Sequence, residues 1–305
     1  MEKSKKKKEK VEQHIVPRTY LKHWRIAEDK NFVYGIDFTN EYRKEVQIFG
    51  LNDKVFKQNR YYNYNLFQKP QIIEDIFGED IEPSYEMIMS EVNSEQNLSQ
   101  PIREKLILWL YISKIRSPFM RDSTERMANF IYKTTERFKD KNLSEEKEKA
   151  IEQYTKQLAK RIQLSKFADK EQADKLWTLF KETLSAKHWR ILKSIPQFQF
   201  WTNDNPGFSP NIDVRFAIDT PYHHVMELNA NSTILYPLSP KYCLEISPFS
   251  MGTALDICAL TMEIKFEQVS PVIIEYINKG VLYTRHKLIV SNNKEILETC
   301  IERST

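Results

Sequence analysis

One histidine, three acids and one arginine stand out as side chains that could do chemistry together. They are His14, Glu74, Glu82, Arg116 and Asp204. A histidine can act as a general base or a metal ligand, and paired carboxylates can bind a divalent cation or divide acid and base roles. An arginine can hold an anionic substrate. These types point to hydrolysis of a charged substrate, provided that the fold brings them into one cavity.

His14 and the glutamates each have a structural alternative. His14 lies just before a helix that Pro17 introduces, because proline lacks the amide hydrogen that a first helical turn leaves unused. Its ring could instead form a local hydrogen bond and pack against aromatic neighbours. Glu82 and Glu86 would share one helical face. Acids at a helix start are, however, also favoured by the helix dipole alone.

Arg116 also allows two interpretations. It follows residues 106–112, the longest apolar run of the chain, so its head group would be partly buried. A buried guanidinium needs a carboxylate or phosphate partner. Arg116 is therefore either a clamp for an anionic substrate or half of a salt bridge to one of the glutamates.

Asp204 lies where a predicted strand gives way to a turn. Residues 198–202 alternate like a strand, and Pro206-Gly207 is typical of a tight turn. Catalytic groups often occupy such positions. The alternative is an Asx-turn, in which Asp204 or Asn205 bonds its own backbone.

The elements that must position these residues are strands at both ends and helices in the middle. β-Formers and alternation predict strands over residues 32–36, 46–49, 198–202, 233–238, 242–246, 262–266 and 288–290. Apolar residues at helical spacing predict helices over 85–92, 106–112, 127–138, 151–162, 176–192 and 271–283. We therefore predict an α+β fold, with one sheet built from N- and C-terminal strands packed against a large central helical insertion.

Two of the predicted helices differ in their patterning. Residues 106–112 are apolar on nearly every face, so that helix should be central and surrounded. The next helix carries Met127, Phe130, Ile131, Thr134 and Phe138 on an amphipathic pattern. Such a pattern predicts one apolar face towards the core and one polar face towards solvent.

Charge is concentrated at the N-terminus. Residues 1–10 carry six lysines and two glutamates, which accounts for the net charge of +4 of the whole chain. We predict a disordered basic tail over residues 1–12 and a single α+β domain over residues 13–305. The tail could add weak affinity for nucleic acid or anionic lipid, or it could serve solubility alone.

Several familiar classes are disfavoured. No segment approaches the roughly 20 apolar residues that span a bilayer, which predicts no membrane span and a cytoplasmic location. The six glycines form neither GxGxxG nor GxxxxGK[ST], so we expect no nucleotide cofactor. Three widely spaced cysteines argue against a disulfide framework or a cysteine-rich zinc site. GxSxG, HExxH and DxDxDG are absent, which weighs against common serine hydrolases, zincins and EF-hands.

Five segments, in order along the chain, resemble the signature of the family called domain of unknown function 4238. They are His14-Ile-Val-Pro17-Arg-Thr-Tyr20-Leu21-Lys-His-Trp24, Ile73-Glu74 with Ile81-Glu82, Arg116-Ser117-Pro118, Phe200-Trp201-Thr202-Asn203-Asp204-Asn205-Pro206 and Tyr236-Pro237-Leu238-Ser239-Pro240. Asn278 corresponds to a late asparagine of the family. Trp24 and Asn203 depart from the usual phenylalanine and serine. The resemblance implies a single-domain bacterial-type protein of unassigned chemistry, some of whose relatives are associated with defence against phage.

Our first hypothesis is a metal-dependent nuclease or another phosphodiester-directed hydrolase of phage defence. His14 would be the base or a ligand, Glu74 would be an acid–base or metal carboxylate, and Arg116 would clamp the anion. Glu82 and Asp204 would bind Mg²⁺ or Mn²⁺, which accept oxygen ligands. The candidate substrate-binding residues are Tyr20, Asn205 and Asn278.

Two other hypotheses stay open. The chain could be a non-catalytic sensor or binding module that recognises a phage protein or nucleic acid, with the motifs holding the fold together. It could also be a group-transferring toxin that acts on a nucleotide. Convergence of the five chemical residues in one open cavity would favour the enzyme, whereas their dispersal would favour the sensor.

Overall fold

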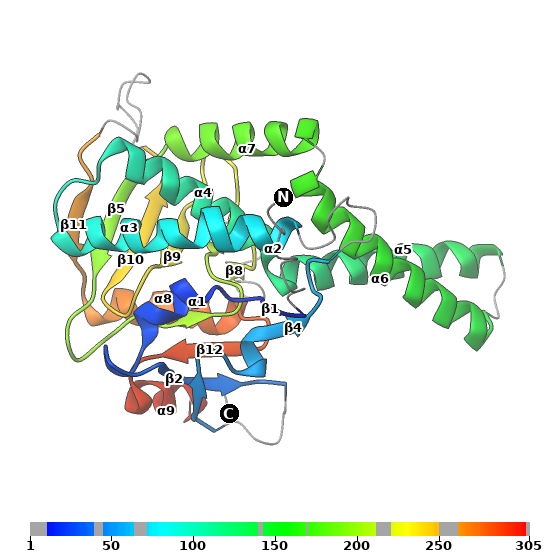
Figure 1. Ribbon diagram of the computed structural model, residues 1–305, viewed down its shortest axis with the longest axis horizontal. Helices are drawn as coiled ribbons and strands as arrows, with labels where there is room; N and C mark the ends of the chain where they lie inside the picture. The colour runs from blue at the N-terminus through cyan, green and yellow to red at the C-terminus, as the bar shows by residue number, and fades with distance from the viewer. Residues whose placement is uncertain are drawn as a thin grey trace, which may run out of the picture.

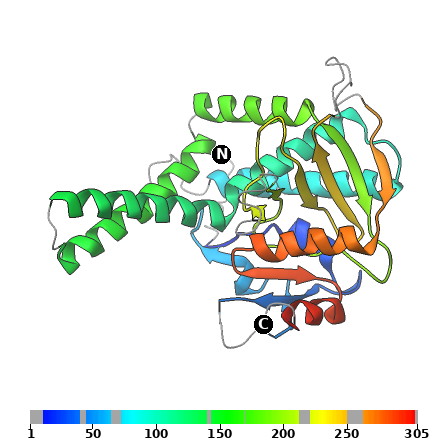
Figure 2. The same ribbon diagram turned by 180° about the vertical axis from the view of Figure 1, so that it is seen from behind.

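The computed structural model describes residues 11–39, 45–63, 72–139, 143–168, 170–211, 221–249 and 262–302 of the chain. Two four-stranded sheets and the helices around them form a body, from which a helical hairpin projects (Figures 1 and 2). Most of the predicted basic tail, residues 1–10, lies outside the described residues. Among the described residues, no helix is both long and apolar enough to cross a membrane.

The first sheet joins strands from the two ends of the chain. Its strands are β2 (Phe32–Asp37), β3 (Gln47–Gly50), β6 (Thr202–Asn203) and β12 (Leu288–Ser291), in the order β3-β2-β12-β6. Neighbouring strands run antiparallel throughout. The α+β class, and the pairing of N-terminal with C-terminal strands, are therefore confirmed. Of the predicted strand over residues 198–202, only the end forms β6.

The prediction of one sheet is wrong, because the later strands form a second sheet of their own. Its strands are β5 (His188–Lys193), β9 (Ile234–Pro237), β10 (Tyr242–Ser247) and β11 (Lys265–Gln268), in the order β11-β5-β10-β9. The predicted continuation of a helix as far as residue 192 is wrong, because β5 begins at His188. Trp189 and Ile191 are buried on one face, and β5 is hydrogen-bonded on both edges, so sheet packing overrides local helix propensity.

Two short strand pairs complete the sheet structure. β1 (Glu12–His14) pairs with β4 (Lys57–Asn59), and β7 (Ser209–Pro210) pairs with β8 (Tyr222–His223). The first pair brings the histidine of the N-terminal motif beside the segment that leads to Arg60 and Tyr61.

The helices cover the sheets and connect them. The short ones are α1 (Arg18–Leu21), η1 (Lys22–Trp24), η2 (Lys54–Phe56), α2 (Ile72–Ile76) and η3 (Phe77–Ile81). The longer ones are α3 (Glu82–Ser94), α4 (Gln100–Arg116), α5 (Pro118–Lys139), α6 (Glu145–Ala168), α7 (Lys170–Ser185), α8 (Pro271–Thr284) and α9 (Lys294–Glu302). In the body, α3 packs on α4, α8 packs on β6, and α9 packs on β2 and β12.

The prediction that residues 106–112 form a central helix is confirmed. Leu106 and Leu110 of α4 are fully buried. Trp109 donates a hydrogen bond from Nε1 to the Tyr236 hydroxyl at 3.0 Å, and its ring lies 4.3 Å from that of Tyr85. Helix α4 thus joins the α3 layer to the second sheet and ends at Arg116 in the interior.

The projecting hairpin consists of α5 and α6, which pack along each other (Figure 1). Its sequence pattern predicts a buried apolar face, but the structure leaves that face open. Met127 is 67% exposed, Phe130 72%, Ile131 53% and Phe138 87%. None of the described residues covers these side chains, because the hairpin extends away from the body.

Gly280 marks the closest approach of α8 to the loop that follows β6. A Cβ atom at this position would overlap the ring of buried Phe208. We expect Gly280→Ala to lower the free energy of unfolding by about 1–3 kcal/mol through overpacking, although alanine is the better helix former. Urea denaturation measures this, with Lys279→Ala on the same helix as the control. That control should stay within about 0.5 kcal/mol of the wild type.

Candidate functional site

Arg116 is the centre of the first cluster that the structure brings together. Its side chain is 1% exposed, and Nη1 lies 3.1 Å from Oε1 of Glu82. Nη2 donates to the carbonyl oxygen of His14 at 2.7 Å, and Nε donates to the Tyr62 hydroxyl at 3.3 Å. The guanidinium also lies 4.4 Å from the centre of the Phe77 ring. The interpretation of Arg116 as half of a salt bridge to a glutamate is thus confirmed.

His14 and Glu74 complete this group, which we call the Arg116 cluster: His14, Tyr62, Glu74, Glu82 and Arg116. Burial lowers the pKa of His14, and its Nε2 lies 3.3 Å from the carbonyl oxygen of Leu51. Buried Glu74 on α2 is close enough to favour the charged form of Arg116. Four of the five candidate catalytic residues, all except Asp204, therefore lie in one cluster. The guanidinium, however, uses Nε, Nη1 and Nη2 on protein groups, which ties β1, α3 and α4 together.

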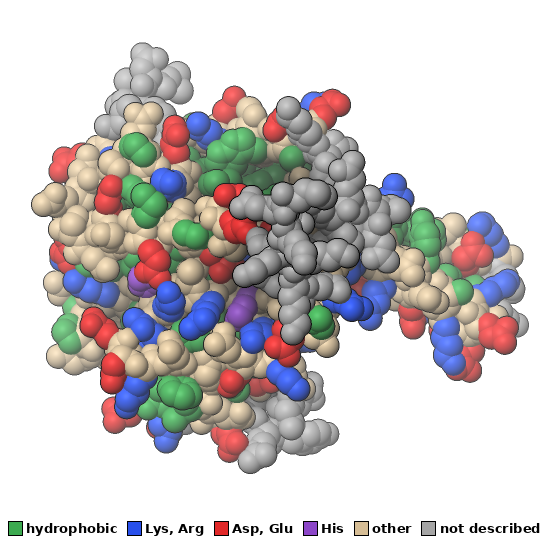
Figure 3. All heavy atoms as spheres, viewed as in Figure 1, with side chains coloured by type: hydrophobic (Ala, Val, Ile, Leu, Met, Phe, Trp, Pro, Cys, Tyr) green, Lys and Arg blue, Asp and Glu red, His purple; other side chains and the backbone are tan. Residues whose placement is uncertain are grey.

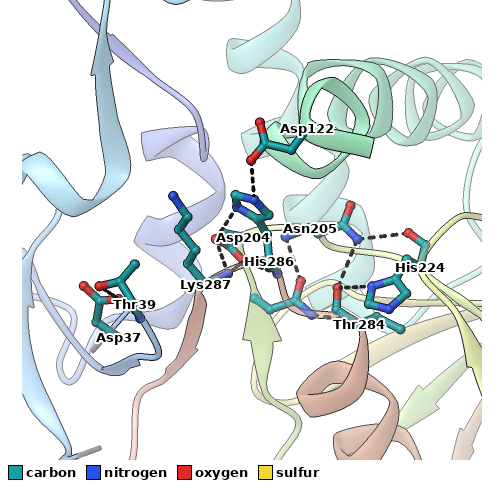
Figure 4. Close-up of polar contacts among 10 residues, drawn as sticks. Asp37, Thr39, Asp122, Asp204, Asn205, His224, Thr284, His286 and Lys287 are labelled. Carbon is teal, nitrogen blue, oxygen red and sulfur yellow. Dashed lines mark hydrogen bonds and ion pairs between the residues drawn. The ribbon is translucent and has the colours of Figure 1, made fainter. Parts of the chain in front are cut away.

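Asp204 belongs to a second group, at the turn after β6. Its Oδ1 accepts hydrogen bonds from the backbone N–H groups of His286 at 2.9 Å and Lys287 at 3.1 Å (Figure 4). Its Oδ2 accepts from the Lys287 N–H at 2.9 Å and lies 3.7 Å from Nδ1 of His286. The predicted Asx-turn of Asp204 or Asn205 does not form. The carboxylate instead fixes the start of β12.

His286 lies between two carboxylates. Its Nε2 is 2.7 Å from Oδ2 of Asp122 on α5, and its Nδ1 faces Asp204 (Figure 4). Burial acts to lower the pKa of His286, but Asp122 and Asp204 outweigh it and raise the pKa to about 9. Burial acts to raise the pKa of Asp122, but its contact with His286 outweighs this and lowers it. We call Asp122, Asp204 and His286 the His286 array; at neutral pH His286 is protonated and Asp122 is ionised.

Asp122 reaches the wall of a cavity of about 570 Å³ at the base of the hairpin. β4, α5, α6 and the start of β12 contribute its lining. The lining residues are Gln58, Asn59, Arg60, Tyr61, Arg121, Asp122, Glu125, Arg126, Asn129, Lys156, Lys160 and Lys287. Six cations thus face two carboxylates, so the cavity has the charge of an anion-binding site.

Two of the cations are held in place by the protein. Arg121 is buried, and it donates from Nε to Gln163 at 2.7 Å and from Nη2 to the Tyr61 carbonyl at 2.9 Å. Its guanidinium lies 3.4 Å from the centre of the Tyr61 ring. Lys160 donates from Nζ to the Arg60 carbonyl oxygen at 3.1 Å, and burial, with Arg121 as a further cause, lowers its pKa. The protein therefore holds the positive charges of Arg121 and Lys160 close together, an arrangement that a bound anion would stabilise.

Tyr61, which lines the cavity, packs against Tyr62 of the Arg116 cluster. Tyr61 contacts Arg121 on the cavity side, whereas Tyr62 contacts Arg116. Their rings are 4.9 Å apart. The cavity and the Arg116 cluster are therefore neighbours, and Asp204 belongs to the separate His286 array. Within the described ranges, no three His, Cys, Asp or Glu side chains gather as ligands for a metal ion.

The three candidate substrate-binding residues all bond to the protein. The Tyr20 hydroxyl contacts the Pro237 carbonyl at 2.7 Å and the Thr202 hydroxyl at 2.5 Å. The Asn205 side chain accepts from Lys114 Nζ at 2.8 Å and donates to the carbonyls of His224 and Thr284. Asn278 accepts from the Trp201 N–H at 2.9 Å and donates to the Gln199 carbonyl. Asn278 also lines a separate, mainly apolar cavity of about 500 Å³.

The sequence patterns did not indicate the groups that line the cationic cavity or most of the His286 array. His286 and Asp122 are separated by 164 positions, so no local spacing joins them. Two segments of the sequence nevertheless carry charged side chains that could have indicated the site. Residues 121–126 place two arginines, an aspartate and a glutamate directly after the Arg116 motif, and His286-Lys287 directly precede a predicted strand.

The raised pKa of His286 predicts that stability depends on pH. The contribution of the His286 array to the free energy of unfolding is complete below the pKa of a histidine in the unfolded chain, about 6.5. It is lost as the pH rises through the pKa of His286 in the folded protein, about 9. We expect the wild type to lose about 3 kcal/mol relative to His286→Gln between these limits. Urea denaturation of both proteins from pH 6 to pH 10 measures the difference, which cancels the titration of other groups. A constant difference would contradict the geometry.

A comparison with family models identifies one match. The model described as a protein of unknown function (DUF4238) matches residues 12–295. Both clusters and the whole cationic cavity lie inside this range. No curated protein and no solved structure matches the chain significantly.

Proposed function

The chain belongs to the family of proteins of unknown function DUF4238, and from this premise we propose a phosphodiester-directed hydrolase of phage defence. Its reaction would take place in the cationic cavity beside the His286 array. The observation that carries the proposal is a cavity in which six cations face two carboxylates, one of them bonded to a histidine. The cationic side chains would bind the phosphates, and the carboxylates would bind the metal ion that activates water.

The cations suit a phosphate-bearing substrate in number and in type. Arginine guanidinium groups bind phosphate through paired hydrogen bonds, and lysines act as point charges. Arg121 is already oriented by Gln163 and Tyr61, so little of its mobility remains to be lost on binding. Lys156 and Lys287 are exposed and would follow the backbone of a longer nucleic acid.

Asp122 and Glu125 would supply the acidic groups of the reaction. They are three positions apart on α5 and line the same cavity. Mg²⁺ and Mn²⁺ accept oxygen ligands, and Mg²⁺ is often held by one or two carboxylates together with substrate phosphates. A divalent ion bound there would stabilise charge on the phosphate and activate water. This reassigns the proposed metal ligands from Glu82 and Asp204 to Asp122 and Glu125.

His286 and Asp204 would position Asp122. His286 lies between the two aspartates and is only 10% exposed, so it acts on the cavity through the carboxylate of Asp122. The charged imidazole keeps Asp122 ionised and fixes the direction of its free oxygen. Outer groups of this kind typically contribute about 10- to 100-fold to activity.

The second candidate is a sensor that binds nucleic acid or another phosphate-bearing phage component without cleaving it. The contacts of the Arg116 cluster, Tyr20, Asn205 and Asn278 favour it, because these motif residues bond to the protein itself. In this candidate the cavity would bind the same chemical class. A cytoplasmic location belongs to both proposals, since both place the phage component inside the cell.

Incubation of the purified protein with labelled RNA, single-stranded DNA, duplex DNA and nucleotides tests the two candidates. Reactions with and without Mg²⁺ or Mn²⁺ are resolved for new 3′ and 5′ ends. Cleavage supports the hydrolase, and salt-dependent binding without cleavage supports the sensor. If the protein neither binds nor cleaves any of them, both candidates are wrong. Plaque counts on cells that express wild type or Asp122→Asn then test the role in defence.

A further inference from the structure

Two smaller hollows adjoin the cationic cavity. The first, of about 190 Å³, is lined by Glu12, Lys54, Lys57 and Asn59. The second, of about 240 Å³, lies along α6 and is lined by Tyr154, Gln157, Leu158, Lys160 and Arg161. Each hollow shares one lining residue with the cavity: the first shares Asn59 and the second shares Lys160. The cavity is therefore part of a larger hollowed surface, which we call the basic groove and define by the residues that line these three hollows.

The basic groove concentrates positive charge. The two hollows add three cations and one acid to the six cations and two acids of the cavity. Residues 1–10 account for the whole net charge of the chain, so the rest of the chain is neutral overall. Figure 3 shows Lys and Arg side chains grouped where the hairpin leaves the body. A neutral domain that gathers cations on one surface has the charge distribution of an anion-binding protein.

Several cations of the groove lack a carboxylate partner. Near the far end of the hairpin, Lys149 lies 2.6 Å from Glu145 and so is paired within the protein. Within the described ranges, Lys54, Lys156 and Arg161 form no such ion pair. The hairpin thus neutralises a lysine near its far end and leaves cations at its base available to a ligand.

The extent of the groove suits several nucleotides rather than one. The central cavity, at about 570 Å³, has the size of a site for one small ligand. Lys54 and Arg161 lie outside this cavity, in the flanking hollows, so a mononucleotide in the cavity would leave both without a phosphate. A nucleic acid carries a phosphate on every nucleotide and would supply them.

Tyr154 favours a single strand over a duplex. It is 49% exposed and lines the hollow along α6. Its ring packs edge to face on Tyr132 with the ring centres 5.2 Å apart, and its hydroxyl accepts a hydrogen bond from the Tyr132 hydroxyl at 3.3 Å. These contacts fix the direction of the ring. The bases of a single strand can stack on such a ring, whereas the bases of a duplex are stacked on one another.

We infer that the basic groove binds single-stranded nucleic acid, with one phosphate in the cavity at Asp122 and neighbouring nucleotides in the flanking hollows. A base stacks on Tyr154, and Lys54 and Arg161 contact phosphates outside the cavity. The inference rests on the proposed function and specifies the substrate class of that same site.

Competition for a labelled single strand tests the inference, in EDTA so that no metal-dependent cleavage occurs. The competitors are oligothymidylate and oligouridylate of about 12 and about 2 nucleotides, and a duplex of about 12 base pairs. In every protein the four lysines at positions 5–8 are replaced by glutamine, so that these lysines add no affinity. We expect the long single strand to bind at least about 100-fold more tightly than the short one and about tenfold more tightly than the duplex.

Substitutions in the flanking hollows should weaken the binding of the long strand alone. Tyr154→Ala should lower its affinity about tenfold. Lys54→Gln and Arg161→Gln, one in each hollow, should each lower it about threefold and reduce the salt slope by about 0.7. The matched control is Tyr132→Ala, which removes the same ring contact from the hairpin but lines none of the three hollows; its affinity should stay within about twofold of the wild type. Urea denaturation verifies that each variant is folded.

The outcomes separate this inference from the proposed function. A short strand that binds as tightly as the long one, together with unchanged affinities for Lys54→Gln and Arg161→Gln, would confine binding to the cavity and overturn the groove. The proposed function would then still stand. A duplex that binds more tightly than the single strand would also overturn the inference alone. If no nucleic acid binds at all, the proposed function fails and the inference fails with it.

Discussion

Asp122→Asn should abolish hydrolysis while leaving the affinity for the substrate nearly unchanged. In the proposed site Asp122 is the carboxylate that joins the His286 array to the cavity. Replacing one carboxylate oxygen by an amide nitrogen removes a negatively charged ligand and changes little in shape. The loss of several kcal/mol of transition-state stabilisation corresponds to about a thousandfold in rate.

Single-turnover cleavage rates, measured with enzyme in excess over the labelled substrate identified in the survey, give this effect separately from product release. Asp29→Asn, an exposed aspartate away from the cavity, is the matched control and should cleave at the wild-type rate. His286→Gln should lose only about 10- to 100-fold, because it acts through Asp122. Asp122→Asn cleaving at more than a tenth of the wild-type rate would remove Asp122 from the reaction.

Asp204→Ala should lower the free energy of unfolding by about 3–5 kcal/mol, whether or not the protein is an enzyme. Asp204 is 2% exposed, and its two oxygens accept from the N–H groups of His286 and Lys287 and face the imidazole. Alanine leaves these buried N–H donors without an acceptor and leaves Asp122 as the one carboxylate beside the charged His286, and each unsatisfied donor costs about 1–3 kcal/mol.

Urea denaturation at pH 7 measures the change, and Asp204→Asn is the graded control. Asparagine keeps one carbonyl acceptor for the backbone donors but removes the charge facing His286, so its loss should be about half as large. A loss below about 1 kcal/mol for the alanine variant would show that the turn is held by other contacts.

Periodicity predicted the elements whose burial repeats along one face. The segments 32–36 and 46–49 became β2 and β3, and the all-round apolar run became α4. It failed at β5, where His188-Trp189-Arg190-Ile191 follows a strong helix and its strand character depends on β10 and β11. It also overestimated burial on α5, since an amphipathic pattern does not say which molecule covers the apolar face.

Part of the candidate site followed from physical necessity and part did not. A buried arginine must find a carboxylate, so the pairing of Arg116 with Glu82 could be expected from their sequence surroundings. Asp122 meets His286 only because α5 begins beside the start of β12, a long-range contact that no local pattern encodes. The cavity depends equally on α6, which supplies Lys156 and Lys160 from a distant segment.

The hydrolase and the sensor share one central claim, that phosphates bind in the cationic cavity. Its most direct test is the salt dependence of the affinity for a labelled single-stranded oligonucleotide. The wild type is compared with Lys156→Gln/Lys287→Gln, two exposed cavity lysines, and with a variant whose Lys5, Lys6, Lys7 and Lys8 are glutamines. The latter separates the basic N-terminus from the cavity.

We predict that the logarithm of the binding constant falls linearly with the logarithm of salt concentration. The cavity variant should reduce the slope by about 0.7 for each lysine that contacts a phosphate. The N-terminal variant should keep most of the affinity. An oligonucleotide that binds the cavity variant as tightly as the wild type, or that loses all affinity when only the N-terminal lysines are changed, would contradict the claim.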